Sequence, residues 1–379
     1  MRFNSGLKKV MLVDAPIEYD RRVQSHIRNL GDIAAIYDIN KAAERLSRLA
    51  WIKIYLQVFR LICHGLGTSL AKWRLLRKHS RDFWPDSVSW RGIRRVFRWL
   101  KLAMMTAHVM GKELGNSGQV EFFCNDLYCA LAATVCKTCA DKKIIYDSHE
   151  LQIFRNRLAG LFAFLIEYGI ESRVVNGADR ILTVNHQLAV MIGKMHQLDA
   201  KIEVFYNDLY THHRIAPPGD AGRPALVYIG QGTRGRRLEM LDRRPESLGF
   251  DVYVSLVGAS LNPVFSGENW HFMAADYEEE LLRLRHERRC AMWCCVDETV
   301  LSYNMATPNK FYQALAAGMP VIATRGTYLS EIVEKYSLGL SVADSVEHLP
   351  RELLSDKYGA WLKGIARFRE LLRAGEVEL

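Results

Sequence analysis

The sequence predicts an α/β protein made of two doubly wound parallel-sheet domains that face each other across a cleft. The chain has 379 residues, more than one hydrophobic core usually supports. Short apolar runs alternate with helical segments, the order typical of parallel strands joined by crossover helices. A stretch rich in Pro and Gly, "APPGDAGRP" (216–224), separates two such alternations and indicates a linker.

The first domain is expected to span residues 1–210. It opens with a strand at "KKVMLVDA", a helix at "DRRVQSHIRNLG" and a second strand at "DIAAIYDI". Helical segments separate the later strands, which are predicted at "VEFFCND" (120–126), "KIIYDSHE" (143–150), "DRILTVN" (179–185) and "KIEVFYN" (201–207).

Residues 41–115 interrupt this alternation and are predicted to be a basic, Trp-rich insertion of two or three amphipathic helices. Between residues 41 and 101, fifteen Lys and Arg face three carboxylates, and five of the eight Trp lie there. Such helices are typical of surfaces that bind an anionic membrane. A solvated helical hairpin is the alternative, and no nucleic acid is expected because nothing resembles a nucleic-acid reader.

The linker is expected at residues 211–224 and the second domain at 225–356. An amphipathic helix in residues 357–379 is expected to pack back on the first domain. Strands of the second domain are predicted at "ALVYIG" (225–230), "VYVSLVG" (252–258), "NWHFMA" (269–274), "RCAMWCC" (289–295) and "PVIAT" (320–324).

The composition favours a cytoplasmic protein that lies on the cytosolic face of a membrane. No run approaches the roughly 20 apolar residues of a transmembrane helix, and the N-terminal apolar run is too short for a signal peptide. Eight Cys in a chain of this length do not indicate a disulfide framework. Cys136 and Cys139 form a CxxC pair, but no second pair completes a tetrahedral set, so we expect no metal.

The stretch "TPNKFYQALAAGMPVIAT" (307–324) predicts a short helix followed by a buried strand. Thr307 is expected to cap the helix, Pro308 suits its first turn, and Gly318 ends it. The first turn of such a helix directs N–H groups and a positive dipole end toward the strand ends, and Lys310 lies in that turn. The pattern therefore predicts an anion site, for which phosphate is the natural occupant.

Several segments together resemble glycosyltransferases with two Rossmann-like domains, the GT-B fold, and particularly glycosyltransferase family 4. "PNKFYQALAAGMPVIAT...LSEIVEKYSLGLSV" is similar to the donor-site signature of that family, and "YIGQGTRGRRLEML" to its phosphate-binding turn. "YDRRVQSHIRNLG", "IIYDSHEL" and "ADRILTVNHQLA" resemble segments of its first domain in the same order. The resemblance covers most of the chain outside about residues 41–115.

The sequence departs from the family pattern at a pair of carboxylates. Family members usually carry two Glu separated by seven residues, and Met305 and Gln313 stand at those positions. In the family the second Glu is taken to grip the ribose hydroxyls. Gln313 retains hydrogen-bonding capacity there but no charge, whereas Met305 cannot bind a sugar hydroxyl.

The resemblance assigns roles to residues on both domains. It implies that Arg236, with Arg234, neutralises the diphosphate that departs, and that Lys310 completes this clamp. His149 and Glu150 are the expected catalytic residues, although a His at a strand end is often structural. Asp20 and Arg21 are expected on the acceptor side, or else simply begin a helix. The expected donor-binding residues are Gly230, Gly232, Arg234, Arg236, Asn309, Lys310, Gln313 and Glu331.

The sequence thus predicts a glycosyltransferase of the hexosyltransferase type that uses a nucleoside diphosphate sugar and needs no cofactor. The expected acceptor is a lipid-linked or saccharide molecule of surface polysaccharide or glycolipid synthesis. The resemblance implies a retaining, metal-independent reaction, whereas an inverting enzyme would require His149 or Glu150 as a base. Two alternatives stay open: a catalytically degenerate scaffold that partners an active enzyme, and a sugar-nucleotide epimerase.

Overall fold

The protein comprises two units, residues Met1–Tyr206 and Asn207–Leu379, each with its own parallel sheet. The structure is a computed structural model. It describes residues 7–14, 21–41, 48–72, 74, 90–115, 118–136, 141–154, 160–198, 202–207, 218–220, 222–232, 235–241, 249–256, 269–273 and 277–377.

The first unit is built on a six-stranded sheet of order β2-β1-β3-β4-β5-β6, in which all paired strands are parallel. Its strands are β1 (Leu7–Val13), β2 (Ala35–Asp38), β3 (Gln119–Asn125), β4 (Asp141–Ser148), β5 (Arg180–Thr183) and β6 (Ile202–Val204). Its α-helices are α1 (Arg21–Leu30), α2 (Arg48–Ala71), α4 (Trp90–Glu113), α5 (Leu127–Val135), α6 (Leu161–Gly177) and α7 (His186–His196), with a short 3-10 turn, η4 (Gln152–Phe154).

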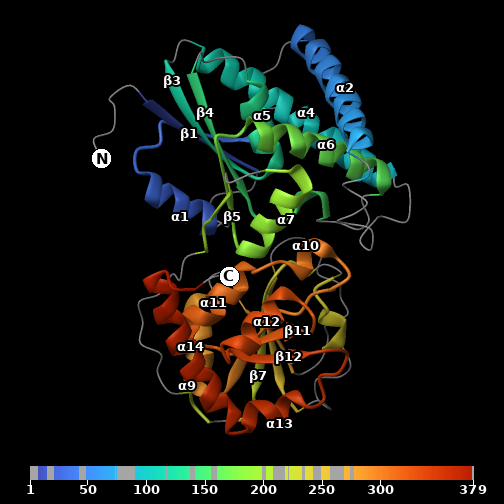
Figure 1. The fold of residues 1–379 in the computed structure, drawn as a ribbon. Helices are drawn as coiled ribbons and strands as arrows, with labels where there is room; N and C mark the ends of the chain where they lie inside the picture. The colour runs from blue at the N-terminus through green and yellow to red at the C-terminus, as the bar shows by residue number, and fades with distance from the viewer. Residues whose placement is uncertain are drawn as a thin grey trace. The chain divides into compact units, whose positions relative to one another are not determined.

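Helices cover both faces of this sheet. Figure 1 shows α1 on one face and α4, α5 and α6 on the other, with α2 outside them. This follows from right-handed crossovers, because the chain moves one way from β1 to β2 and the opposite way for the later strands. The strands of the unit that the sequence predicts are therefore confirmed, within a few residues at each end.

The predicted insertion contains the helices α2 and α4, and both pack against the rest of the unit. Leu100, Met104 and Met105 of α4 are buried. The helix α2 crosses α6 at Gly65 and Gly169, where a Cβ on Gly169 would lie 2.1 Å from the Gly65 carbonyl oxygen. Ser69 of α2 also donates a hydrogen bond to the Leu165 carbonyl of α6. These helices are thus part of the packed unit.

The second unit is built on a sheet of order β12-β11-β10-β7-β8-β9, again parallel throughout. Its strands are β7 (Ala225–Gly230), β8 (Asp251–Leu256), β9 (Trp270–Phe272), β10 (Cys290–Trp293), β11 (Val321–Thr324) and β12 (Gly339–Val342). Its helices are η6 (Leu238–Met240, a 3-10 turn), α9 (Glu278–Glu287), α10 (Leu301–Asn304), α11 (Asn309–Ala317), α12 (Tyr328–Lys335), α13 (Leu349–Leu354) and α14 (Lys357–Ala374).

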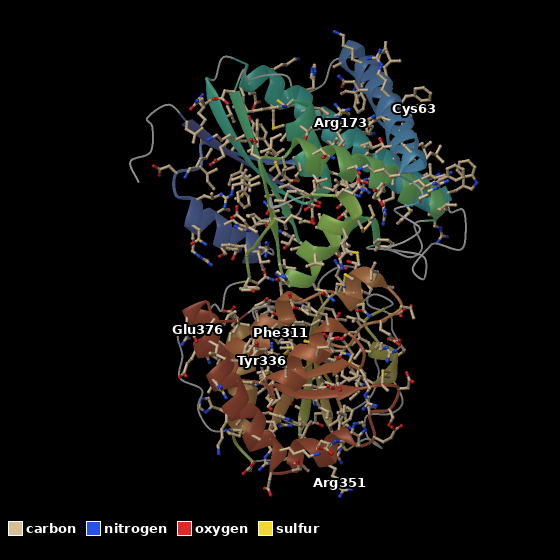
Figure 2. All side chains as sticks on the ribbon, viewed as in Figure 1. Cys63, Arg173, Phe311, Tyr336, Arg351 and Glu376 are labelled. Carbon is tan, nitrogen blue, oxygen red and sulfur yellow. The ribbon has the colours of Figure 1, made fainter. Side chains whose placement is uncertain are left out.

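The last helix, α14, packs within the second unit. Tyr358 and Trp361 join its core beside Trp293 of β10. Phe368 contacts the rings of Phe311 and Tyr336, which Figure 2 labels on the ribbon of this unit. The expected packing of this helix on the first domain stays a prediction.

Candidate functional site

The site in the second unit lies where the strand order of its sheet reverses. The chain leaves β7 for β8 and β9 on one side, then returns to the other side of β7 to form β10. In open parallel sheets, ligands bind at the carboxyl ends of the strands at such a switch point. The segments that follow β7 and β10 therefore carry the residues to consider.

The helix α11 begins at this edge and has no side-chain cap. Its N-cap is Pro308, one residue later than the Thr307 cap that the sequence predicts, and Thr307 is buried. A proline at the N-cap offers no side-chain oxygen, so no cap side chain occupies the N–H groups of Asn309 and Lys310, whereas the Phe311 N–H donates to the Pro308 carbonyl. The predicted end of the helix at Gly318 is confirmed, because Gly318 is its C-cap and has a left-handed φ of 69°.

The C-terminal end of α11 is held by two buried arginines. Arg285 of α9 donates a hydrogen bond of 3.0 Å to the Gly318 carbonyl, and Arg369 of α14 donates one of 3.5 Å to the Ala316 carbonyl. Positive charge at this end complements the helix dipole. The helix is therefore anchored from behind, while its first turn faces the strand ends.

Lys310 is a buried cation in the first turn of α11. Its side chain is 6% exposed, and its Nζ lies 4.2 Å from the centroid of the Tyr228 ring. The Nζ has no hydrogen-bond partner in the described part of the chain. Burial, with a smaller contribution from the nearby Arg236, lowers the pKa of Lys310 to about 7. A buried ammonium group in this state has a strong preference for an anion.

The loop after β7 brings Arg236 to the same place. Gly235 has a φ of 87°, and a Cβ there would lie 2.9 Å from the Tyr303 ring. The next residue, Arg236, places its guanidinium 4.5 Å from the centroid of that ring. Arg237 instead forms an ion pair with Glu298, so its charge is already paired within the protein. Among the described arginines of this loop, Arg236 is the one available to a ligand.

The other expected donor-side residues lie on the loop after β7, on α11 and on α12. Gly230 ends β7 with a φ of 136°, and Gly232 is half-buried in the loop. Asn309 is exposed and accepts a hydrogen bond of 2.6 Å from Asn207. Glu331 is exposed in the first turn of α12, the helix that Thr327 caps. Arg234 lies outside the described residues.

Gln313 and Met305 occupy the two positions of the family carboxylates. The Gln313 amide nitrogen donates a hydrogen bond of 2.6 Å to the Tyr277 hydroxyl. Its carbonyl oxygen can still accept. Met305 is buried at the end of α10. Neither side chain reproduces a carboxylate.

In the first unit, a buried charge network lies at the end of β4. Asp147 is fully buried and accepts hydrogen bonds from Arg22 at 2.9 Å. Its Oδ2 also lies 2.8 Å from the Nε2 atoms of His26 and His149. Burial alone would raise the pKa of Asp147, but Arg22 and His149 hold it well below its usual value. Asp147 is thus an anion that fixes three donors.

His149 is the member of this network that reaches solvent. Its side chain is 19% exposed, whereas those of Arg22 and Asp147 are almost fully buried. Burial opposes its charged form, but Asp147 outweighs burial and, with Asp126, raises the pKa of His149 to about 9. The imidazole is therefore protonated at neutral pH and can donate a proton or hydrogen bond to a ligand. A protonated imidazole has no lone pair to accept a proton, so this state favours the donor role.

Glu150 follows His149 in the turn after β4 and is half-exposed. Of the expected acceptor-side pair, Asp20 lies outside the described residues, and Arg21 begins α1 with a side chain that is not described. Their roles stay predictions.

The described cysteines are free, and no cluster of three or more metal-ligating side chains occurs among the described residues. Burial raises the pKa of the Cys124, Cys129 and Cys294 thiols, which keeps them protonated. They pack as small apolar groups. In the part of the chain described, no helix is both long and apolar enough to span a bilayer.

Sequence reasoning missed Arg22, His26, Tyr228 and Tyr303. Arg22 and His26 lie in "DRRVQSHIRNLG", where they read as the polar face of a helix. The two tyrosines lie in or beside apolar runs, where they read as core residues. An aromatic residue two positions before the end of a strand that leads into a basic loop is the signal that could have found Tyr228.

Comparisons with known proteins agree with the fold of the two units. Residues 294–377 match the family model described as glucosyltransferase 3-like, C-terminal domain. A sucrose-phosphate synthase from Thermosynechococcus elongatus has a similar structure, with a TM-score of 0.55, 14% identity, and coverage of 72% of this chain and 74% of that one. The fold is GT-B.

A second structure of this fold is a point mutant of TarM from S. aureus, solved with fondaparinux, alpha-GlcNAc-glycerol and UDP. It has a TM-score of 0.51 and 11% identity, and the match covers 71% of this chain and 55% of TarM. No curated protein sequence matches this chain. The C-terminal part of the chain is thus similar to a glycosyltransferase domain, and the whole has the two-domain architecture of such enzymes.

Proposed function

We propose that this protein is a glycosyltransferase that moves a hexose-type sugar from a nucleoside diphosphate sugar to a lipid-linked or saccharide acceptor. The observation that carries the proposal is Lys310, a buried cation without a hydrogen-bond partner in the described structure, at the switch point of the second sheet. The match of residues 294–377 to a glycosyltransferase domain supports it. Surface polysaccharide or glycolipid synthesis is the expected setting.

In this proposal the diphosphate of the donor binds Lys310, Arg236 and the first turn of α11. The leaving diphosphate gains negative charge as the glycosidic bond breaks, so fixed positive groups stabilise the transition state more than the ground state. Two cations and a helix N-terminus supply this stabilisation without a divalent ion. We therefore propose a metal-independent reaction.

We propose that the reaction retains the anomeric configuration, with a phosphate oxygen of the donor accepting the proton of the acceptor hydroxyl. The raised pKa of His149 supports this assignment, because it disfavours His149 as the deprotonated base that an inverting reaction at neutral pH would require and leaves Glu150 as the other candidate base. His149 would instead donate a hydrogen bond to a phosphate or sugar oxygen. Glu150, the next residue along the chain, would be the second catalytic residue.

We propose that the protein attaches peripherally to an anionic membrane through the first unit. The helix α2 has no Asp or Glu, and its exposed side chains include Ile52, Leu56 and Phe59. Exposed apolar residues beside basic ones favour an interfacial position on the membrane. The cytosolic face is the expected location.

A catalytically degenerate scaffold is the second candidate. Gln313 already donates its amide hydrogen to Tyr277, and Met305 is buried, so the two family carboxylates have no charged replacement at their positions. A sugar-nucleotide epimerase is less favoured, and it would isomerise a nucleotide sugar without any acceptor.

The test is calorimetric titration with UDP, GDP, CDP, ADP and dTDP in the presence of a chelator. UDP comes first because TarM, which has the same fold, was solved with it. We expect one nucleotide to bind and Lys310→Ala to weaken that binding by about 100-fold, since a charge-assisted contact in a desolvated site is worth roughly 3 kcal/mol. The matched control is Lys335→Ala, because Lys335 is exposed and also lies over a tyrosine ring, that of Tyr336.

Binding that survives Lys310→Ala would contradict the assignment of the donor site. If no nucleotide binds the folded wild-type protein, the scaffold hypothesis replaces the enzyme hypothesis.

A further inference from the structure

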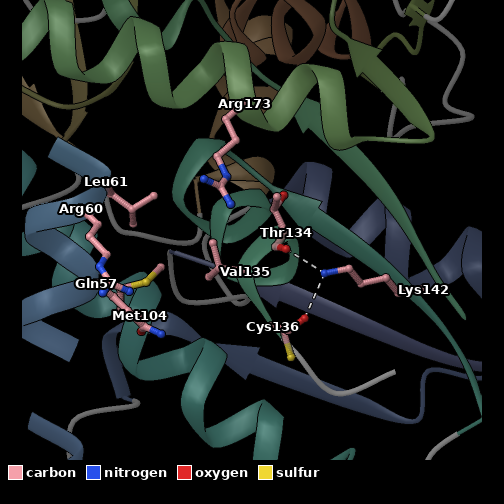
Figure 3. A pocket seen from close by; sticks show the side chains of 9 residues that line it. All are labelled: Gln57, Arg60, Leu61, Met104, Thr134, Val135, Cys136, Lys142 and Arg173. Atoms are coloured by element: carbon pink, nitrogen blue, oxygen red, sulfur yellow. Dashed lines mark hydrogen bonds between the residues drawn. The ribbon is translucent and has the colours of Figure 1, made fainter. Parts of the chain in front are cut away.

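A pocket of about 390 Å³ lies in the first unit, away from the charge network of Asp147. It is bounded by α2, α4, the end of α5, the start of β4 and α6 (Figure 3). Lys142 is the second residue of β4, and Asp147 lies five residues further along that strand, so their backbones are about 16 Å apart at 3.3 Å per residue. The pocket therefore belongs to the opposite edge of the sheet.

The lining of this pocket is positive. Arg60 of α2, Arg173 of α6 and Lys142 of β4 line it, and none of the described lining residues is a carboxylate. Figure 3 shows Arg173 and Arg60 approaching from different helices. Neither arginine has an ion-pair partner within the described part of the chain, and both are exposed.

Lys142 neutralises the negative end of a helix that faces the pocket. The carboxyl end of α5 faces it, and such a helix end carries about half a negative charge. The Lys142 ammonium donates hydrogen bonds of 3.0, 2.7 and 3.0 Å to the Ala133, Thr134 and Cys136 carbonyls. The full positive charge of Lys142 outweighs the partial negative charge of the α5 end. This helix end therefore adds no net negative charge beside Arg60 and Arg173.

The neighbouring surface is also positive. His108 lies one turn beyond the pocket residue Met104 on α4. Burial lowers the pKa of His108, and Lys112 and Lys53 lower it further. Burial is the larger cause of this shift, and the smaller contribution of the two lysines shows that positive charges lie near His108.

The helix α2, which contributes Arg60 to the pocket, also presents an apolar stripe next to the pocket cations. Ile52, Leu56, Phe59 and Leu70 are 57–65% exposed, and their spacing places them on one face of the helix. The residues that directly follow Ile52, Leu56 and Phe59 form the adjoining face of α2, and they are Lys53, Gln57 and Arg60. Gln57 and Arg60 of this face line the pocket. A ligand with a negative head and apolar chains would match both faces.

We propose that this pocket binds the phosphate group of an anionic phospholipid, with Arg60 and Arg173 as the cations that contact it. The head group enters between α2 and α6, and the acyl chains lie along the apolar stripe of α2. That the phosphate belongs to a lipid rests on the membrane attachment proposed above. That the pocket binds a phosphate group does not depend on sugar transfer.

The test titrates the full-length protein with two soluble probes at about 0.15 M salt, where long-range attraction is screened. One probe is a short-chain phosphatidylglycerol below its micelle concentration, and the other is glycerol phosphate. The pocket variant is Arg60→Gln with Arg173→Gln. The control is Arg94→Gln with Arg98→Gln, which removes the same charge from exposed positions of α4 that do not line the pocket.

We expect the wild type and the control to bind the short-chain lipid alike, and the pocket variant to bind it at least about tenfold more weakly, as the loss of charge-assisted contacts requires. Glycerol phosphate should bind more weakly than the lipid. Equal binding of the two probes would overturn the lipid assignment. No lipid binding, or equal losses in both variants, would overturn the site itself.

Nucleotide titration of the same two variants separates this proposal from the previous one. Arg60 and Arg173 lie in the first unit and Lys310 in the second. Both variants should therefore bind nucleotide like the wild type, whatever the lipid result.

Discussion

Lys310 couples the proposed donor site to the stability of the second unit. Its pKa falls from 10.5 to about 7 on folding because its ammonium group is buried. Below pH 7 the group is charged in both states, so the folded state bears the full cost of burying the charge. Between pH 7 and 10.5 the folded state becomes neutral while the unfolded state keeps its proton. The stability of the fold therefore rises with pH across this range.

We expect Lys310→Met to stabilise the protein at pH 6 by about 4 kcal/mol, the order of magnitude that the pKa shift implies. At pH 10 the same substitution should change stability by less than about 1 kcal/mol, because Lys310 is then neutral in the fold. Urea unfolding of both proteins at the two pH values measures this. Lys335→Met is the control, and an equal effect of Lys310→Met at both pH values would rule out the buried-charge explanation.

The roles of single residues could be predicted only where a local motif marks them. Lys310 and Arg236 follow from their places beside a helix start and a Gly-containing turn, and the structure brings them together. Arg22 acts on Asp147 across 125 residues of sequence, and no spacing rule relates two positions so far apart. His149 is protonated because Asp147 beside it is ionised, and Arg22 helps to keep Asp147 ionised. The sequence does not show this network, so it left the roles of base and donor both open for His149.

At the scale of elements, the crossing of α2 over α6 depends on two glycines. A Cβ on Gly65 would lie 2.8 Å from the Ile166 carbonyl oxygen, and one on Gly169 would lie 2.1 Å from the Gly65 carbonyl oxygen. Backbone atoms cannot yield as a flexible side chain can. The two helices approach closely because neither glycine carries a side chain.

We expect Gly169→Ala to lower the free energy of unfolding by about 3 kcal/mol or more, at the upper end of overpacking effects. Gly67→Ala, on the same helix α2, should instead stabilise by about 0.5–1 kcal/mol, since nothing lies within 4 Å of its Cβ position. Denaturant unfolding of both variants provides the measurement. Similar effects at the two positions would mean that the close crossing does not exist.

Strands with continuous apolar runs were predictable, and β12 was not. It contains Gly339 and Ser341 and so lacks such a run. Gly339 is needed there because a Cβ would lie 2.1 Å from the Val321 carbonyl oxygen of the neighbouring strand. The helices α2 and α4 were predictable as helices, but their burial was not, because α4 turns Met104 and Met105 inward between its basic residues.

At the scale of the whole molecule, charge and apolar surface are both concentrated in the first unit. The chain carries a net charge of +9, while α2 has no carboxylate and α4 has Glu113 alone. Deleting these helices would remove buried residues such as Leu100 and Met104 from the unit. A test of membrane attachment must therefore change the surface and keep the helices.

We expect the protein to bind vesicles that contain phosphatidylglycerol at low ionic strength and to leave them at about 0.5 M salt, where electrostatic attraction is screened. Leu56→Ser with Phe59→Ser should weaken this binding by about tenfold or more, because two apolar side chains no longer enter the interface. Co-sedimentation measures the bound fraction. The control is Phe272→Ser with Leu354→Ser, two exposed apolar residues of the second unit. Equal losses in both pairs would contradict a membrane face on α2.

The two arginines at the far end of α11 have a consequence for the electric field at its first turn. Arg285 and Arg369 hold the Gly318 and Ala316 carbonyls, so the axis of the helix is fixed before any ligand arrives. A dipole that is already aligned needs no reorganisation when negative charge develops in front of it. The final helix of the chain, through Arg369, thus helps to set the direction of a field that acts about 13 Å away, at the length of nine helical residues.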